Sequence, residues 1–157
     1  MLVTAVAFLL YFSGSGMSQA AADAADETWM GAERIALLCH VQGPAGTQMA
    51  ELSRQICAEA RGTIVGWTDL PVEVLGWGDP ALIAPQTVAL LVHGAAGEPP
   101  AGEGLLAVTI GIRRGGQATR LFGTRPRIAP ITRTRDVIEA SLAELFARSP
   151  AVEGRVD

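Results

Sequence analysis

The two cysteines are the residues whose chemistry is simplest to predict. Cys39 falls on the same face of a predicted strand as Leu37 and Val41. Cys57 lies beside Ile56 on a predicted helix, and if that helix packs on that face the two thiols come within disulfide distance. Closing a loop of roughly 18 residues would stabilise the fold by about 3 kcal/mol. The alternative is a pair of buried free thiols. Redox catalysis is not favoured, because the two cysteines do not form a C-x-x-C motif.

His40 and His93 each stand near the end of a predicted strand. If those strands are neighbours, the two imidazoles share one rim of the sheet. Metal-binding histidines often show H-x-x-x-H or H-x-E spacing, and neither occurs here. A histidine in a strand is more often a hydrogen-bonded structural residue. We therefore expect no metal site and no cofactor.

A glycine-containing loop separates the first predicted strand from the first predicted helix. Its candidate anion-binding residues are Gly43, Gly46 and Thr47. Backbone N–H groups and the helix dipole favour anions at such a turn. However, the loop lacks the G-x-x-x-x-G-K-[ST] spacing, G-x-G-x-x-G is absent, and the chain has no lysine to reach a phosphate. An ordinary strand-to-helix turn, in which glycine reverses the chain, is the favoured explanation of these glycines.

Nothing in the sequence identifies a catalytic centre. No serine stands in G-x-S-x-G, and the carboxylates are scattered through turns and helix surfaces. A non-catalytic protein is therefore favoured over an enzyme, with no catalytic residue to name.

Two tryptophans stand in a near-repeat, G-W-T-D and G-W-G-D, at Trp67 and Trp77. Two aromatic rings on adjacent turns could stack against a sugar or a peptide. The favoured interpretation is that both rings close the rim of the core.

Charge is distributed unevenly along a chain of net charge −4 and pI near 5.2. The segment 113–135 contains seven arginines and no carboxylate. The arginines are Arg113, Arg114, Arg120, Arg125, Arg127, Arg133 and Arg135. A basic segment on an acidic protein favours contact with an anionic partner, for which Arg113, Arg114, Arg120 and Arg125 are the candidates. The simpler interpretation, which is slightly favoured, is that these arginines are spread over the solvent faces of the strands and loop. An acidic chain does not favour nucleic acid.

The elements that position these residues begin with a strand over 35–42 and a helix ended by Gly62. Short β-type runs over 62–67 and 72–77 follow, with a capped turn at Asp79-Pro80. A buried strand over 87–93 precedes a hairpin of runs 105–113 and 117–124, turned by two glycines. Residues 124–131 are expected to run extended, and the last helix is expected to be capped by Asp136, with Glu139 at N3.

This order, β-α-β-β-β-β-α, predicts an α+β domain with a mixed sheet of about five strands, two main helices on one face, and a single layered core. A doubly wound nucleotide-binding fold is less favoured, because helix and strand stop alternating after the first unit.

The N-terminus resembles a secretory signal. An apolar run over 2–12 precedes small residues, which predicts a signal peptide at 1–22, although no basic residue precedes the run. A flexible leader over 23–32, the domain over 33–150 and a disordered tail over 151–157 complete the predicted organisation. An uncleaved anchor or a hydrophobic strand is the alternative for the apolar run.

Together these patterns predict an exported, non-catalytic binding or accessory protein of the bacterial cell envelope, periplasmic or secreted. Its partner would be an anionic envelope protein or ligand, with no nucleic acid and no stable membrane span after signal removal. The alternative is a small enzyme or nucleotide/phosphate-binding protein that uses Gly43 to Thr47. A self-assembling structural role is a third hypothesis, and the sequence specifies neither pathway nor oligomeric state.

Overall fold

Two long parallel strands form the centre of the sheet, β1 (Arg34–Gln42) and β3 (Thr87–Gly97). In the computed structural model, which describes residues 27–43, 48–97, 104–117 and 122–147, β1 pairs with β3 along its whole length. Both strands are rich in β-branched and leucine side chains that are buried on the helix side.

Four further strands extend this pair. The order is β2-β1-β3-β4-β5, with β2 (Val72–Val74) parallel to β1 and β4 (Leu105–Arg114) antiparallel to β3. The far edge of β4 is shared by two short antiparallel strands, β5 (Phe122–Gly123) and β6 (Arg127–Pro130). The sheet is therefore mixed.

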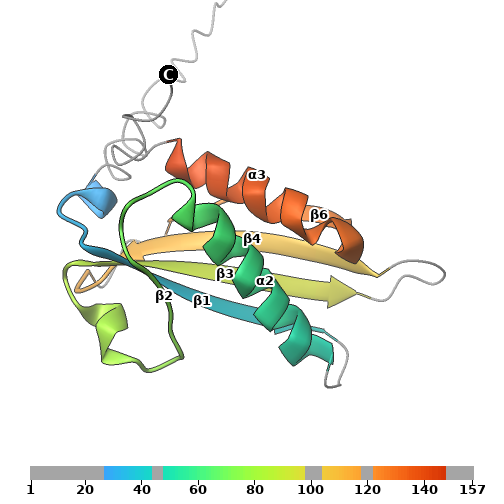
Figure 1. The fold of residues 1–157 in the computed structure, drawn as a ribbon. Coiled ribbons are helices and arrows are strands. Elements are labelled where there is room, and N and C mark those ends of the chain that lie inside the picture. The colour runs from blue at the N-terminus through green and yellow to red at the C-terminus, as the bar shows by residue number, and fades with distance from the viewer. Residues whose placement is uncertain (1–26, 44–47, 98–103, 118–121, 148–157) are drawn as a thin grey trace, which may run out of the picture.

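Two helices, α2 (Gln48–Val65) and α3 (Thr134–Phe146), pack side by side on one face of the sheet (Figure 1). The main core lies between the helices and that face, and its largest fully buried side chains include Ile35, Leu37, Ile56, Leu90 and Ile138. The predicted α+β class, with a mixed sheet and two main helices, is confirmed.

Helix α2 is longer than the sequence predicted. Gly62 was expected to end it and residues 62–67 to form a short strand, but the helix continues to Val65. The reason is that Ile64 extends the buried stripe of Ile56 and Ala60, while Gly62 lies on the exposed side. Burial of Ile64 outweighs the weak helix preference of one exposed glycine.

The start of α3 also differs from the prediction. The helix begins at Thr134, so Asp136 lies within its first turn and does not cap it. A 3₁₀ turn, η2 (Ile131–Arg133), runs directly into the helix, and the Thr134 hydroxyl donates to the Ile131 carbonyl at 2.5 Å. Asp136 instead accepts two hydrogen bonds from the Arg133 guanidinium.

The glycine turn after β4 packs against a second turn. Gly115 donates its N–H to the Thr87 carbonyl at 2.8 Å, and a Cβ at Gly115 would collide with the backbone of Ala84. Gly116 has φ +74°, which favours glycine. The first strand of the predicted hairpin is present. Of the second, predicted over 117–124, the structure describes β5 at its C-terminal end, and residues 118–121 lie outside the described part of the chain.

The opposite face of the sheet is covered at one end by the connection between β2 and β3. Its 3₁₀ turn, η1 (Pro80–Ile83), is capped as predicted, since the Asp79 carboxylate accepts from the Ala81 N–H at 2.8 Å. Leu82 and Leu75 of this connection pack on Leu38 and its neighbours. Among the described residues, no helix packs on the rest of that face (Figure 1).

The N-terminal part of the described chain packs against the domain. Residues 27–29 form a short helical turn, and Trp29 is only 5% exposed. Its ring lies 4.9 Å from that of Phe146, between centroids. The sequence prediction starts the domain at residue 33, but Trp29, which precedes that boundary, already belongs to the core. Among the described residues, no helix combines the length and apolarity that crossing a membrane requires.

Candidate functional site

Cys39 and Cys57 form a disulfide, as the sequence predicted, with their Cα atoms 5.6 Å apart. Cys39 lies on the helix side of β1 and Cys57 on the buried side of α2. Ser53, one turn before Cys57, donates its hydroxyl to the Cys39 carbonyl at 3.1 Å. The covalent bond therefore joins the central strand to the first helix at their interface.

Arg114 is held by backbone carbonyls at the start of the domain. Its guanidinium donates to Gly31 at 2.7 Å and to Thr28 at 3.4 Å, and its Nε donates to the Pro85 carbonyl. Burial lowers the pKa of Arg114, and the nearby Glu33 carboxylate partly offsets that effect. Arg114 therefore holds the N-terminal segment against the end of β4, and three of its five N–H donors are engaged within the domain.

Arg113 lies next to Arg114 but points to the opposite face of β4. It pairs across the sheet with Ala89, on the face that carries no helix, and is half-buried. Arg120 falls outside the described residues. Of the four candidate contact arginines, the structure leaves Arg113 and Arg125 with side chains that a partner can reach.

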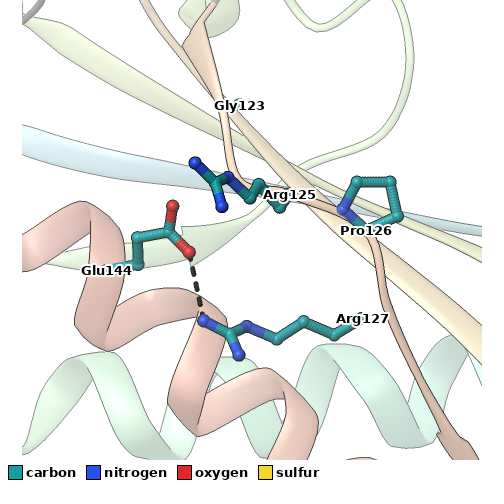
Figure 2. A pocket seen from close by; sticks show the side chains of 5 residues that line it. All are labelled: Gly123, Arg125, Pro126, Arg127 and Glu144. Atoms are coloured by element: carbon teal, nitrogen blue, oxygen red, sulfur yellow. Dashed lines mark hydrogen bonds and ion pairs between the residues drawn. The ribbon is translucent and has the colours of Figure 1, made fainter.

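Arg125 and Arg127 line a cleft of about 600 Å³ between the β5–β6 connection and α3. Figure 2 shows their side chains with the Glu144 carboxylate, and the remaining lining residues are Gly123 and Pro126. Arg127 Nη2 lies 3.1 Å from Glu144 Oε2. No hydrogen bond or ion pair joins Arg125 to any of the residues that the structure describes. The cleft therefore contains one neutralised arginine and one available arginine.

The electrostatics of this cleft favour an anion. Two guanidinium groups face one carboxylate, which leaves an excess positive charge at the opening. The Arg127 Nε is buried and lacks a hydrogen-bond partner within the described part of the chain. A planar guanidinium binds carboxylate or phosphate oxygens through two parallel hydrogen bonds. The cleft is thus suited to an oxyanion group on a larger partner.

The two tryptophans of the near-repeat have different surroundings. Trp67 follows α2, packs on the core and meets the Phe146 ring edge-on, with centroids 5.6 Å apart. Trp77 stands in the turn before η1 and is 69% exposed. Because the Trp67 ring is engaged by the core, only Trp77 remains a candidate contact residue.

The glycine loop can be assessed only at its first residue. A Cβ at Gly43 would lie 2.5 Å from Met49 Sδ and 3.3 Å from Ala96, so close packing accounts for this glycine. Gly46 and Thr47 lie outside the described residues, and the anion-binding hypothesis for the loop stays untested.

The two histidines do share one rim of the sheet. His40 on β1 pairs with His93 on β3, and the two rings lie 5.9 Å apart between centroids. Within the described residues, no group of three or more His, Cys, Asp or Glu side chains is placed to bind a metal. Local spacing could not reveal this pair, because parallel strand register brings the two residues together.

Comparisons with known proteins give similarity of fold only. No protein-family model matches the chain, and no curated protein matches it. Among solved structures, two forms of the PelC dodecamer from Paraburkholderia phytofirmans are similar, each with 15% identity. They cover 75% and 74% of this chain and 88% and 86% of theirs, with TM-scores of 0.46 and 0.45.

A hypothetical protein, CT253 of Chlamydia trachomatis, is also similar, with 11% identity, a TM-score of 0.26, and coverage of 74% of this chain and 92% of its own. Similarity at these levels assigns the chain to no family.

Proposed function

We propose that this protein is an exported, non-catalytic binding or accessory module of the bacterial cell envelope, which holds an oxyanion-bearing partner at Arg125. The observation that carries the binding proposal is the cleft in which Arg125 stands beside the paired Arg127 and Glu144. The location is supported by the disulfide, because such bonds persist in oxidising compartments and are rare in the cytosol.

The chemistry of the cleft supports contact with a large partner more than capture of a small molecule. Its walls are charged and mainly polar, whereas small-molecule pockets are predominantly apolar and enclosed. A single available guanidinium at an open cleft contributes mainly to the orientation and rate of docking. The partner therefore presents carboxylates or phosphates at its surface and makes further contacts outside the cleft.

A charge-reversal experiment tests the binding proposal. The probes are a fluorescent deca-glutamate peptide and vesicles rich in phosphatidylglycerol, which separate an acidic protein surface from an anionic lipid surface. We expect wild-type protein to bind one of them and Arg125→Glu to bind it at least about tenfold more weakly. Glu144→Gln should bind it more tightly, since it removes the carboxylate that competes for the guanidinium groups.

The matched control is Arg54→Glu. Arg54 is exposed on α2, which lies on the same face of the sheet as α3 but packs over β1 and β2, toward the edge opposite the cleft. The change alters net charge equally. Binding should fall with added salt in wild type and in this control. Equal affinities for wild type and Arg125→Glu, or equal losses in both charge reversals, would remove the cleft from the proposed function.

The location is tested separately, by intact mass in fractions of the native cell with and without reduction before alkylation. A form in the envelope or the medium, shortened near residue 22 and alkylated only after reduction, is the expected result. A full-length cytosolic form with two alkylatable thiols would contradict export. This outcome is independent of the vesicle and peptide measurements.

A further inference from the structure

His40 and His93 stand opposite each other on neighbouring strands. In the parallel register of β1 and β3 they are direct partners, so their Cα atoms share one level of the sheet. The residues before them, Cys39 and Val92, face the helices. Because successive side chains in a strand point to opposite faces, both imidazoles project from the other face of the sheet. That is the face opposite α2 and α3, on which the described part of the chain places no α-helix (Figure 1).

No described residue covers the region around the pair completely. The connection between β2 and β3, which covers one end of this face, packs on Leu38 and Leu91. Each of these leucines lies two residues before the histidine of its strand. Beyond them, His40 is exposed and His93 is half-buried. The residue after His93 on the same face is Ala95, which is also exposed, so no large side chain from β3 covers the imidazoles there.

The distance between the two imidazole rings is close to that of two histidines that bind the same metal ion. The centroids are 5.9 Å apart and the planes are inclined by 33°. Two imidazoles on one tetrahedral ion, with metal–nitrogen bonds of about 2.0–2.1 Å, have centroids roughly 5 Å apart. Rotation about the side-chain bonds closes this difference without movement of the strands.

We propose that His40 and His93 form a two-histidine site for a divalent transition-metal ion of the Cu²⁺, Ni²⁺ or Zn²⁺ class. The remaining coordination positions are taken by water, because no carboxylate or thiolate joins the pair within the described residues. Imidazole suits these ions, and Cu²⁺ binds most tightly. The sequence predicted no metal site, because it lacks the H-x-x-x-H and H-x-E spacings of common metal-binding motifs.

This site is independent of the arginine cleft. It lies on the face of the sheet away from α3, whereas the cleft lies between α3 and the β5–β6 connection. Loss of metal binding would therefore leave the binding of the anionic probes unchanged, and the two proposals can fail separately.

The test is titration of untagged protein with Cu²⁺, followed by calorimetry and by pulsed electron paramagnetic resonance to count coordinated imidazoles. We expect one ion per chain with two imidazole ligands. His40→Gln and His93→Gln should each leave one imidazole on the ion and weaken binding at least about tenfold, since losing a ligand costs no less than losing an outer-shell partner. The double variant provides the background, because the chain has only two histidines.

A gain-of-binding variant completes the design. Gln42 stands two residues after His40 and pairs with Ala95, so Gln42→His adds a third imidazole to the same face and forms a triangle with the pair. Three histidines hold Zn²⁺ well, and we expect Zn²⁺ affinity to rise at least about tenfold.

Wild-type Cu²⁺ affinity in both single-histidine variants would overturn the proposal. So would two independent ions with one imidazole each, or no gain of Zn²⁺ affinity with Gln42→His. Circular dichroism of each variant establishes that the sheet is retained.

Discussion

Adjacent arginines at the end of β4 have different tasks, because alternation along a strand sends them to opposite faces. Arg114 is bonded to carbonyls of the N-terminal segment and of the turn before β3. Arg113 emerges on the face without helices. A run of arginines in a sequence therefore cannot be treated as one charged surface.

Arg113 and Arg114 can be compared to measure how much the hydrogen bonds of Arg114 contribute to stability. We expect Arg114→Ala to lower the free energy of unfolding by about 1–3 kcal/mol, since it removes charge-assisted hydrogen bonds and leaves carbonyl groups unpaired. Arg113→Ala should change it by less than about 0.5 kcal/mol. Urea denaturation measures both changes. Similar losses of stability in the two variants would show that the hydrogen bonds of Arg114 do not hold the N-terminal segment.

At the scale of elements, α2 is the most informative case. It is covalently tied to β1 and continues past the glycine at which the sequence suggested an end. Its length is set by the buried stripe that ends with Ile64 and not by local preference.

Gly62→Ala tests this helix directly. No atom lies within 4 Å of a Cβ built at Gly62, and the residue is exposed within the helix. Alanine should therefore raise the free energy of unfolding by about 0.5–1 kcal/mol through helix propensity. Thermal and urea denaturation measure the gain. A helix that stopped at Gly62 would show no gain or a loss.

Reduction of the disulfide tests the link between α2 and β1. The free energy of unfolding should fall by about 3 kcal/mol when Cys39 and Cys57 are reduced, because the unfolded chain regains the freedom of a closed loop. Denaturation with and without dithiothreitol measures this difference, and a double Cys→Ala variant should match the reduced protein. Unchanged stability on reduction would show that the bond constrains little.

The sequence predicted the α+β class, the central strands and the disulfide, because alternation and helical spacing report burial directly. It could not place Trp29 in the core, since that residue follows an Ala- and Asp-rich segment and its partner Phe146 lies at the other end of the chain. The start of α3 was missed because Asp136 has the side chain of a cap while η2 determines where the helix begins. The cleft depends on Glu144 meeting Arg127 across elements, a contact that no local pattern encodes.

For the whole molecule, one aromatic cluster joins the ends of the described chain. Phe146 of α3 contacts Trp29 from the N-terminal segment and Trp67 from the end of α2. Three segments far apart in sequence thus meet at one buried ring, which is 2% exposed.

Phe146→Ala should lower the free energy of unfolding by about 3–5 kcal/mol, because a large buried ring leaves a cavity. The neighbouring Leu145, which is only partly buried, is the control, and Leu145→Ala should cost clearly less. Tryptophan fluorescence would follow the change, since Trp29 and Trp67 both lose a ring contact. Equal effects of the two variants would show that the cluster does not hold these segments together.

The position of the disulfide has a consequence for biogenesis. Both cysteines precede β3 and β4 in the chain. If the chain is exported N-terminus first, as proposed, β1 and α2 would emerge and could be oxidised while β3 and β4 were still crossing the membrane. Because the chain has only two cysteines, no competing intramolecular pairing exists. Maturation would therefore require an oxidant but no disulfide isomerase, and the covalently closed β1–α2 unit would template the arrival of the later strands.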